Sequence, residues 1–192
     1  MALWLTGDAD ADAFLADNPL ALVIGMVLDQ QVPFERAFAA PLELQRRLRR
    51  PLDAKAIAAM DHDKYTEAFT RTKALHRYPT TMAERTQRLC KIVEEDFAGD
   101  ASTIWTTASD AHELARRLKT LPGFGEQKAK IFMALLAKQL GVKPKGWREE
   151  CAPYGEPKTT MSIADVSDAA SLEAVRTFKR AGKQAAKASP SA

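Results

Sequence analysis

The stretch that decides the fold is residues 121–129, with the sequence LPGFGEQKA. Pro122 predicts the end of a helix, because the residue before a proline is pushed out of the helical region of backbone space. Gly123 and Gly125 can adopt a positive φ and leave room for another molecule to approach the backbone closely. The stretch therefore predicts a tight hairpin between two helices.

Helical periodicity flanks this turn on both sides. The segment 109–120 begins at a candidate N-cap, Ser109, and repeats leucine at a four-residue interval. The segment 126–140 carries apolar residues on one face and stops at Gly141. We therefore expect the hairpin to join two amphipathic helices.

The start of the second predicted helix has the properties of an anion-binding site. Its first backbone N–H groups have no acceptor within the helix, and the helix dipole places partial positive charge there. Lys128 in the first turn would add a charge-assisted contact. A DNA phosphate is an anion of the right kind. The alternative is an ordinary helical hairpin in which proline and glycine only turn the chain.

The pattern Leu-Pro-Gly-x-Gly-x-x-x-Ala resembles the hairpin of the helix-hairpin-helix (HhH-GPD) DNA glycosylase superfamily, and the resemblance covers about residues 19–141. The chain as a whole also resembles short actinobacterial proteins that are described as base-excision-repair-like. The resemblance implies that double-stranded DNA is the partner. It also implies a DNA-binding surface with these hairpin residues: Leu121, Gly123, Phe124, Gly125, Gln127 and Lys128.

A second stretch that carries the resemblance is LDQQ at residues 28–31. It ends an apolar segment, residues 20–32, which follows an Asn-Pro capping pair and predicts a central buried helix. In the superfamily a glutamine at the end of this helix fills the gap left by a flipped-out nucleotide. Gln31 matches that glutamine, with Gln30 beside it. The alternative is that both are exposed residues at a helix end.

One departure from the superfamily concerns strand cleavage. Members that also cleave the strand carry a lysine at the seventh hairpin position, and its amine forms a Schiff base with the sugar. That position is Gln127 here. Lys128 lies about 100° further round the helix, so we expect it to face away from the same pocket. The sequence therefore predicts no lyase activity through a hairpin lysine.

A second departure concerns the catalytic carboxylate. The superfamily has an aspartate about 18 to 20 residues after the seventh hairpin position, where it stabilises the oxocarbenium-like sugar or activates water. Counting from Gln127 reaches residues 145–147, and residues 126–162 contain no aspartate. Glu149 is the best remaining candidate for the catalytic residue. The alternative is a site without chemistry.

Three further features leave two interpretations open. Trp147 and Tyr154, in the Gly/Pro-rich segment 142–157, either stack on a flipped base or close the core. Asp165 is either a late catalytic acid or a helix cap. A basic cluster is either a phosphate-binding patch or a solvated helix end, and it comprises Arg46, Arg47, Arg49 and Arg50.

Composition argues against cofactors and membranes. Two cysteines are too few for the four-cysteine iron–sulfur loop of the superfamily, and the three histidines lack metal-ligand spacing, so we expect no cofactor and no metal. No apolar run approaches the length of a membrane span, and the first residues lack a signal pattern. We expect a cytoplasmic, nucleoid-associated monomer. The formal net charge is only +3, so DNA binding must come from local patches.

Nearly every segment shows helical periodicity, and no alternating run indicates a sheet. We predict an all-α fold, a two-lobed helical bundle of the glycosylase type, with residues 1–187 as one domain and residues 188–192 as a disordered tail. The favoured function is a monofunctional DNA glycosylase that hydrolyses the N-glycosidic bond of a damaged or modified base. The alternatives are a non-catalytic binder of damaged or distorted DNA and a structural or interaction domain.

Overall fold

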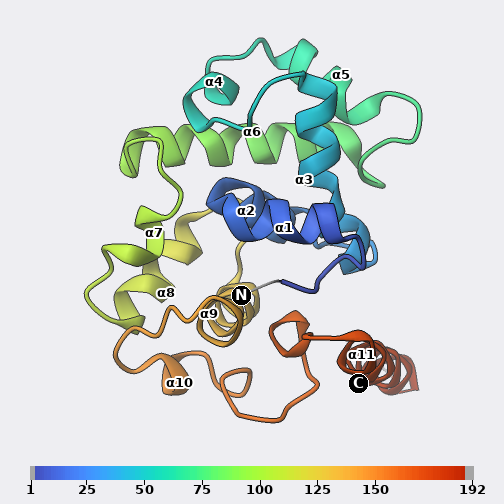
Figure 1. Ribbon diagram of the computed structural model, residues 1–192, viewed down its shortest axis with the longest axis vertical. Coiled ribbons are helices and arrows are strands. Elements are labelled where there is room, and N and C mark those ends of the chain that lie inside the picture. Colours follow the sequence, from blue (N-terminus) through green and yellow to red (C-terminus); the bar gives the residue numbers. More distant parts are fainter. Residues whose placement is uncertain (1–2, 189–192) are drawn as a thin grey trace.

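The computed structural model describes residues 3–188, and the regular secondary structure in this part of the chain is helical, with no strand (Figure 1). The prediction of an all-α fold is confirmed. Residue 188, the first of the predicted disordered tail, is the last residue that the structure describes. Residues 189–192 lie outside the described part. The described helices are α1 (Ala9–Asp17), α2 (Pro19–Leu28), α3 (Phe34–Leu48), α4 (Ala54–Ala58), α5 (His62–Thr70), α6 (Pro79–Asp96), α7 (Thr103–Thr106), α8 (Ala111–Thr120), α9 (Glu126–Gln139), α10 (Trp147–Glu150), the 3₁₀ helix η1 (Ile163–Asp165) and α11 (Ala169–Ala188).

The helices form two groups. Helices α1 to α6 make up the upper group in Figure 1, in which the long helix α6 packs against α4 and α5 on one side and against α2 on the other. Helices α7 to α11 make up the lower group, with α9 in contact with α8, α10 and η1, and α11 docked through η1. One continuous set of buried apolar side chains runs through both groups.

Helix α2 is the central buried helix, as predicted. Asn18 caps it by accepting a 2.9 Å hydrogen bond from the Ala21 N–H, and every residue from Leu20 to Leu28 is buried. A Cβ on Gly25 would lie 2.7 Å from a ring carbon of Phe38, so this glycine lets α3 approach closely. The helix ends at Leu28, four residues before the expected end, which places the two glutamines outside it.

Helices α1 and α2 also bear on the question of a membrane span. No single described helix has both the length and the apolar character to cross a membrane. Taken as a pair, α1 and α2 reach that length and composition, but the chain bends by 116° between them. In the folded chain α2 lies at the centre of the packed helices, against α1, α3 and α6.

Candidate functional site: a basic cleft between the hairpin and the end of helix α2

The hairpin forms between α8 and α9, as the sequence predicts. The Phe124 N–H donates a 3.1 Å hydrogen bond to the Leu121 carbonyl and closes the turn. Gly123 has a φ of +81°, as expected for a residue that turns the chain at no steric cost. Gly125 does not use this freedom, because it has φ −84° and ψ 178° as the extended N-cap of α9.

The start of the first hairpin helix also differs by one residue from the expectation. Asp110, not Ser109, is the N-cap of α8, and its carboxylate accepts a 2.9 Å hydrogen bond from the Glu113 N–H. The Glu113 carboxylate in turn accepts from the Ser109 N–H at 2.7 Å. The two residues satisfy backbone donors reciprocally, as in a capping box, which fixes the entry into the hairpin.

The predicted DNA-binding residues of the hairpin divide into inward and outward groups. The side chains of Leu121 and Phe124 are buried, and the Phe124 ring meets Phe132 edge-on with 5.6 Å between the ring centroids. These two residues hold the turn in shape rather than reaching outward. Gly123 and Gly125 are exposed, as is Gln127, so the outer surface of the turn is mostly backbone.

The first turn of α9 is open to approach from outside. The first intrahelical hydrogen bond runs from the Ala129 N–H to the Gly125 carbonyl, so the N–H groups of residues 126–128 have no acceptor within the helix. A Cβ on Gly125 would have no atom within 4 Å, which leaves the approach to these N–H groups clear. The one carboxylate in this turn, Glu126, pairs with Lys130 at 3.2 Å.

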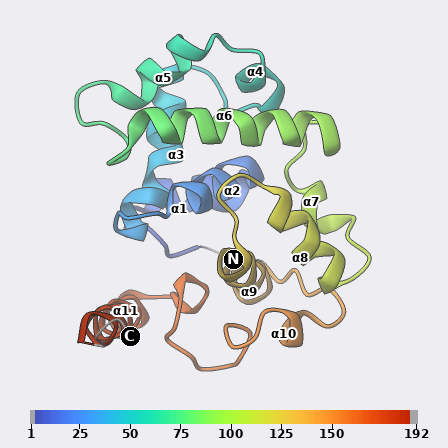
Figure 2. The same cartoon turned by 180° about the vertical axis from the view of Figure 1, so that it is seen from behind.

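The turn of the hairpin lies against the end of α2 (Figure 2). A Cβ on Gly123 would lie 3.0 Å from the Gln30 Nε2 and 3.1 Å from the Arg85 Cδ. Gln30 is held from three sides, since its Nε2 donates to the Val27 carbonyl, its Oε1 accepts from Arg85 at 2.8 Å, and its own carbonyl accepts from a histidine. Gln30 is therefore a structural residue of the junction between the two groups of helices.

Gln31, by contrast, points outward. It is exposed and has a φ of +55°, a left-handed conformation that costs a residue other than glycine about 1–2 kcal/mol. Its Oε1 accepts a 3.1 Å hydrogen bond from the hydroxyl of Tyr78. Strained, exposed polar residues of this kind are concentrated at functional sites.

His76 and Tyr78 position the segment that holds Gln31. The buried His76 ring donates from Nε2 to the Gln30 carbonyl at 2.9 Å and accepts at Nδ1 from the Tyr78 N–H at 3.0 Å, so the ring is neutral. Burial lowers the pKa of His76, which favours this neutral form. The Tyr78 ring is 41% exposed, with the Arg77 guanidinium 5.4 Å from its centroid. Tyr78 was not among the predicted site residues. Its position between a basic segment and a helix-starting proline is a sequence feature that could have pointed to it.

Lys128 faces inward, contrary to expectation. Its Nζ donates to the Met26 carbonyl at 2.7 Å and lies 3.4 Å from the Val27 carbonyl, both in the last turn of α2. Burial lowers its pKa to about 8, although the nearby Asp29 carboxylate acts in the opposite direction. The expectation that Lys128 faces away from the pocket of Gln127 is wrong, because both residues line the same cleft. The rotation by one helical position turns Lys128 towards α2, and its long side chain reaches from α9 to the carbonyls at the end of α2.

This cleft has a volume of about 1500 Å³ and is bounded by the end of α2, the start of α3, the first turn of α9 and one face of α11. Gln31 and Gln127 lie in its lining. Asp29 and Glu35 are its two carboxylates, and Glu35 pairs with Arg176 at 2.6 Å. The basic side chains in the lining are Arg36, Arg77, Lys128, Arg176, Lys179 and Arg180. The lining therefore has a net positive charge, although Glu173 also pairs with Arg176 and Arg180.

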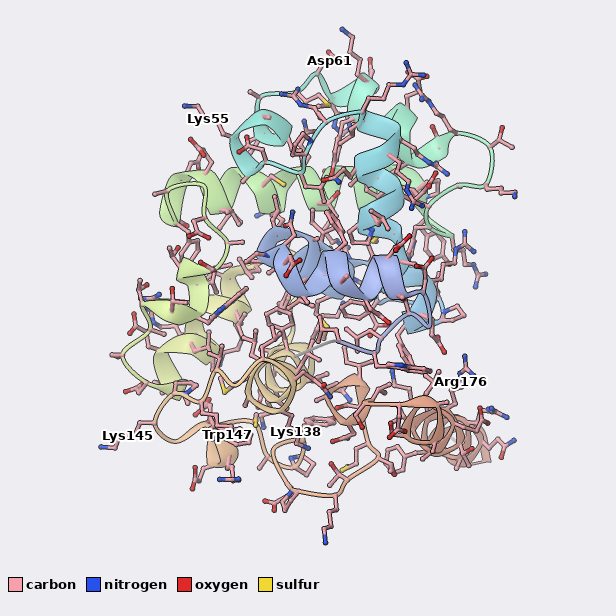
Figure 3. The ribbon with its side chains drawn as sticks, viewed as in Figure 1. Lys55, Asp61, Lys138, Lys145, Trp147 and Arg176 are labelled. Carbon is pink, nitrogen blue, oxygen red and sulfur yellow. The ribbon has the colours of Figure 1, made fainter. Side chains whose placement is uncertain are left out.

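Glu149 lies outside this cleft. It is exposed on α10, which packs against α8 and α9, and α10 contributes no residue to the lining. Figure 3 shows Trp147 of α10 and Arg176 of α11 on opposite sides of α9. The structure therefore does not bring Glu149 together with the hairpin and Gln31. The carboxylates in the lining of the cleft are Asp29 and Glu35, and neither was among the predicted site residues.

Each residue or cluster that the sequence left with two interpretations makes contacts within the protein. Trp147 is buried beneath the Arg148 guanidinium, and Tyr154 accepts a 2.9 Å hydrogen bond from Gln127. Asp165 completes the capping box of η1 and pairs with Lys138 at 2.6 Å. In the arginine cluster, Arg47 donates to the Ala68 and Lys73 carbonyls, whereas the other three arginines are partly or fully exposed.

Among the residues that the structure describes, no group of histidine, cysteine, aspartate or glutamate side chains is arranged to hold a metal ion. Comparison of the chain with protein-family models, with curated proteins and with solved structures finds no match in any of the three.

Proposed function

We propose that this protein is a DNA-binding base-excision-repair protein of the helix-hairpin-helix glycosylase type. Its reaction would be hydrolysis of the N-glycosidic bond of a damaged or modified base in double-stranded DNA, without strand cleavage, in the cytoplasm. The observation that carries the proposal is the placement of an open helix N-terminus and an outward-pointing glutamine, Gln31, on the rim of one basic cleft.

The first part of the proposal is the grip on the DNA backbone. A phosphate that approaches Gly125 meets the N–H groups of residues 126–128 and the positive end of the α9 dipole. Arg176, Lys179 and Arg180 of α11 supply positive charge across the cleft. Phosphate contacts of this type carry no sequence information, which suits an enzyme that must scan many bases.

The second part is the extrusion of a base. A flipped nucleotide leaves a gap in the stack, and a polar side chain that enters the gap can pair with the orphaned base. Gln31 is suited to this role because its backbone conformation and its hydrogen bond to Tyr78 hold it at the surface. The exposed ring of Tyr78 would stack beside it on a neighbouring base.

The third part is the absence of a lyase step. The seventh hairpin position is Gln127, which has no nucleophilic amine and donates a hydrogen bond to Tyr154. The lysine that follows it is held by two carbonyls of α2. Hydrolysis by water therefore fits the cleft better than attack by an amine.

A second candidate function is a binder of damaged or distorted DNA that performs no chemistry. The observation that favours it is the position of Glu149, the sequence-based catalytic candidate, outside the cleft. A third candidate, a structural or interaction domain, predicts that the cleft has no affinity for DNA. The three candidates make different predictions for the same experiment.

The experiment measures binding and base release on a panel of duplexes, each with one modified base. Binding is followed by fluorescence anisotropy between low and moderate salt, and base release by single turnover with alkali treatment to reveal abasic sites. Release from any duplex supports the glycosylase. Salt-dependent binding without release from any duplex supports the non-catalytic binder. No binding at low salt contradicts the proposal and leaves the third candidate.

A further inference from the structure

Exposed basic side chains continue from the cleft along helix α3 and the loop at residues 71–78, which joins α5 to α6. Arg77 of this loop lies in the cleft lining. Arg36, which also lines the cleft, donates from Nη2 to the Ala74 carbonyl at 2.6 Å and so joins the loop to the start of α3. We call the exposed cations of this surface the basic ridge, which comprises Arg46, Arg49, Arg50, Lys73 and Arg77.

Contacts within the protein hold the loop against α3. Arg47 donates from Nη1 to the Ala68 carbonyl at 2.9 Å and from Nη2 to the Lys73 carbonyl at 3.0 Å. The Leu75 N–H donates to the Phe69 carbonyl at 3.0 Å, and the Leu75 side chain is buried. Lys73 itself has a φ of +61°, a conformation that is uncommon for a residue other than glycine. The loop and α3 therefore form one continuous surface on which the ridge cations are exposed.

The ridge cations have no acidic partner in the part of the chain that the structure describes. The carboxylates nearest to them in the sequence pair with arginines outside the ridge, Glu43 with Arg47 at 2.8 Å and Glu67 with Arg71 at 3.0 Å. The Arg77 guanidinium lies 5.4 Å from the centroid of the Tyr78 ring, which is a neutral partner. The positive charge of the ridge is therefore available to an external anion.

Charge is segregated between the two ends of α6. The helix begins at Pro79, directly after the ridge residue Arg77, and its last turn has no basic residue and contains Glu94, Glu95 and Asp96. Figures 1 and 2 show the two ends of α6 on opposite sides of the molecule. A surface that serves only solubility mixes both signs, whereas a field of one sign that leads into a cleft steers a ligand of opposite charge. The ridge is therefore suited to a polyanion that also enters the cleft.

We propose that the basic ridge binds the phosphate backbone of the DNA on one side of the base that the cleft receives. The inference rests on the proposed function and adds a second contact region to the one at the hairpin. Helix α3 has 15 residues, which at 1.5 Å per residue span about 22 Å. This distance corresponds to about six base pairs at a spacing of 3.4 Å. The ridge thus has the length to follow one flank of a duplex whose modified base lies at the cleft.

The test measures duplex affinity by fluorescence anisotropy while the length of each flank is changed. Every duplex carries one tetrahydrofuran abasic analogue, with about ten base pairs on both sides or with the 5′ or the 3′ flank cut to about three. The ridge variant combines Arg46→Gln, Arg50→Gln and Lys73→Gln, whose side chains make no hydrogen bond or ion pair within the described residues. We expect it to bind the full duplex at least about tenfold more weakly than wild type at low salt. The slope of log affinity against log salt should fall by about two to three.

The matched control removes the same charge from exposed positions outside the ridge and the cleft lining. It combines Lys55→Gln, Lys91→Gln and Lys145→Gln. Figure 3 shows Lys55 and Lys145 on the side of the molecule opposite to Arg176, which lines the cleft. We expect this variant to stay within about threefold of wild type on every duplex, because charges further away than a Debye length are screened.

Each outcome decides the inference. The decisive support is a difference between wild type and ridge variant that disappears when one particular flank is shortened and persists when the other is shortened. An equal loss in the ridge and control variants would show an effect of net charge alone and overturns the inference. A ridge variant that loses the same affinity on all three duplexes, or none on any, also overturns it and leaves DNA binding by the cleft intact. If wild-type protein binds no duplex at low salt, the proposed function fails, and the inference fails with it.

Discussion

The Nζ of Lys128 donates a 2.7 Å hydrogen bond to the carbonyl oxygen of Met26, a residue 102 positions earlier in the chain. This contact joins the negative end of the buried helix α2 to the positive start of the hairpin helix α9. It brings the hairpin and Gln31 to one cleft, although neither element predicts the other's position.

Gly125→Asp should weaken DNA binding without weakening the fold. Aspartate is a preferred N-cap residue, the backbone at Gly125 is in an ordinary extended conformation, and a Cβ there meets nothing within 4 Å. The new carboxylate, however, would stand where we place the phosphate. We expect about a tenfold loss of duplex affinity at low salt in fluorescence anisotropy. Gly125→Asn supplies a neutral cap and should bind as wild type, and equal affinity for both variants would contradict the phosphate site.

Gly123→Ala should destabilise the junction between the two groups of helices. Gly123 has a φ of +81°, and a Cβ would lie 3.0 Å from the Gln30 Nε2 and 3.1 Å from the Arg85 Cδ. Gly141→Ala is the matched control, since Gly141 has a φ of +73° with no atom within 4 Å of a Cβ. Backbone strain should cost both variants about 1–2 kcal/mol in urea unfolding. A Gly123→Ala variant no less stable than Gly141→Ala would show that the contact with Gln30 and Arg85 is easily displaced.

Gln31→Gly should stabilise the protein and impair its function. Glycine adopts the φ of +55° at this position without steric cost, so we expect the free energy of unfolding to rise by up to about 1 kcal/mol. The side chain that pairs with Tyr78 is lost, so base release should fall. Lys158→Gly relieves a similar φ of +57° at an exposed position outside the cleft lining and should leave base release unchanged. Undiminished release by Gln31→Gly would exclude the gap-filling role.

Lys128→Met should remove a pH dependence of stability in the alkaline range. The pKa of Lys128 falls from its ordinary 10.5 to about 8 in the folded protein, so the unfolded chain binds more protons between these values. The free energy of unfolding of the wild type should therefore rise with pH from about 8 to 10.5, by about 3 kcal/mol relative to Lys128→Met. Urea unfolding of both proteins across this range measures the difference. A constant difference would mean that Lys128 keeps its ordinary pKa.

Asp165→Asn should destabilise the protein without affecting base release. The Asp165 side chain is 3% exposed, pairs with Lys138 at 2.6 Å and accepts from the N–H groups of Met161 and Ser162. Loss of one partner leaves a partly buried ammonium uncompensated, at a cost of about 3 kcal/mol. Asp168→Asn alters an exposed cap and should cost much less. Loss of base release in a folded Asp165→Asn protein would restore Asp165 as a catalytic candidate.

The sequence was most informative where a few neighbouring residues decide the structure. The turn at Pro122 and Gly123, the cap at Asn18 and the burial of α2 follow from interactions within a few positions of the chain. At Gly125 the sequence left the backbone conformation open, because glycine permits a positive φ without requiring one. The short α2 was another, since apolar composition alone does not mark the last residue of a helix.

The candidate site depended on contacts that no local pattern encodes. The sequence could not show that Gln30 is held by Arg85 and His76 while Gln31 points outward, because their partners lie 46 to 55 residues away. It could not show that Lys128 turns inward, or that Asp29 and not Glu149 enters the cleft. By itself the sequence determined the helical class of the fold, the cap at Asn18 and the hairpin, because those depend on neighbouring residues. Only the tertiary structure decided which side chains share the cleft, because packing between distant helices sets the direction in which each one points.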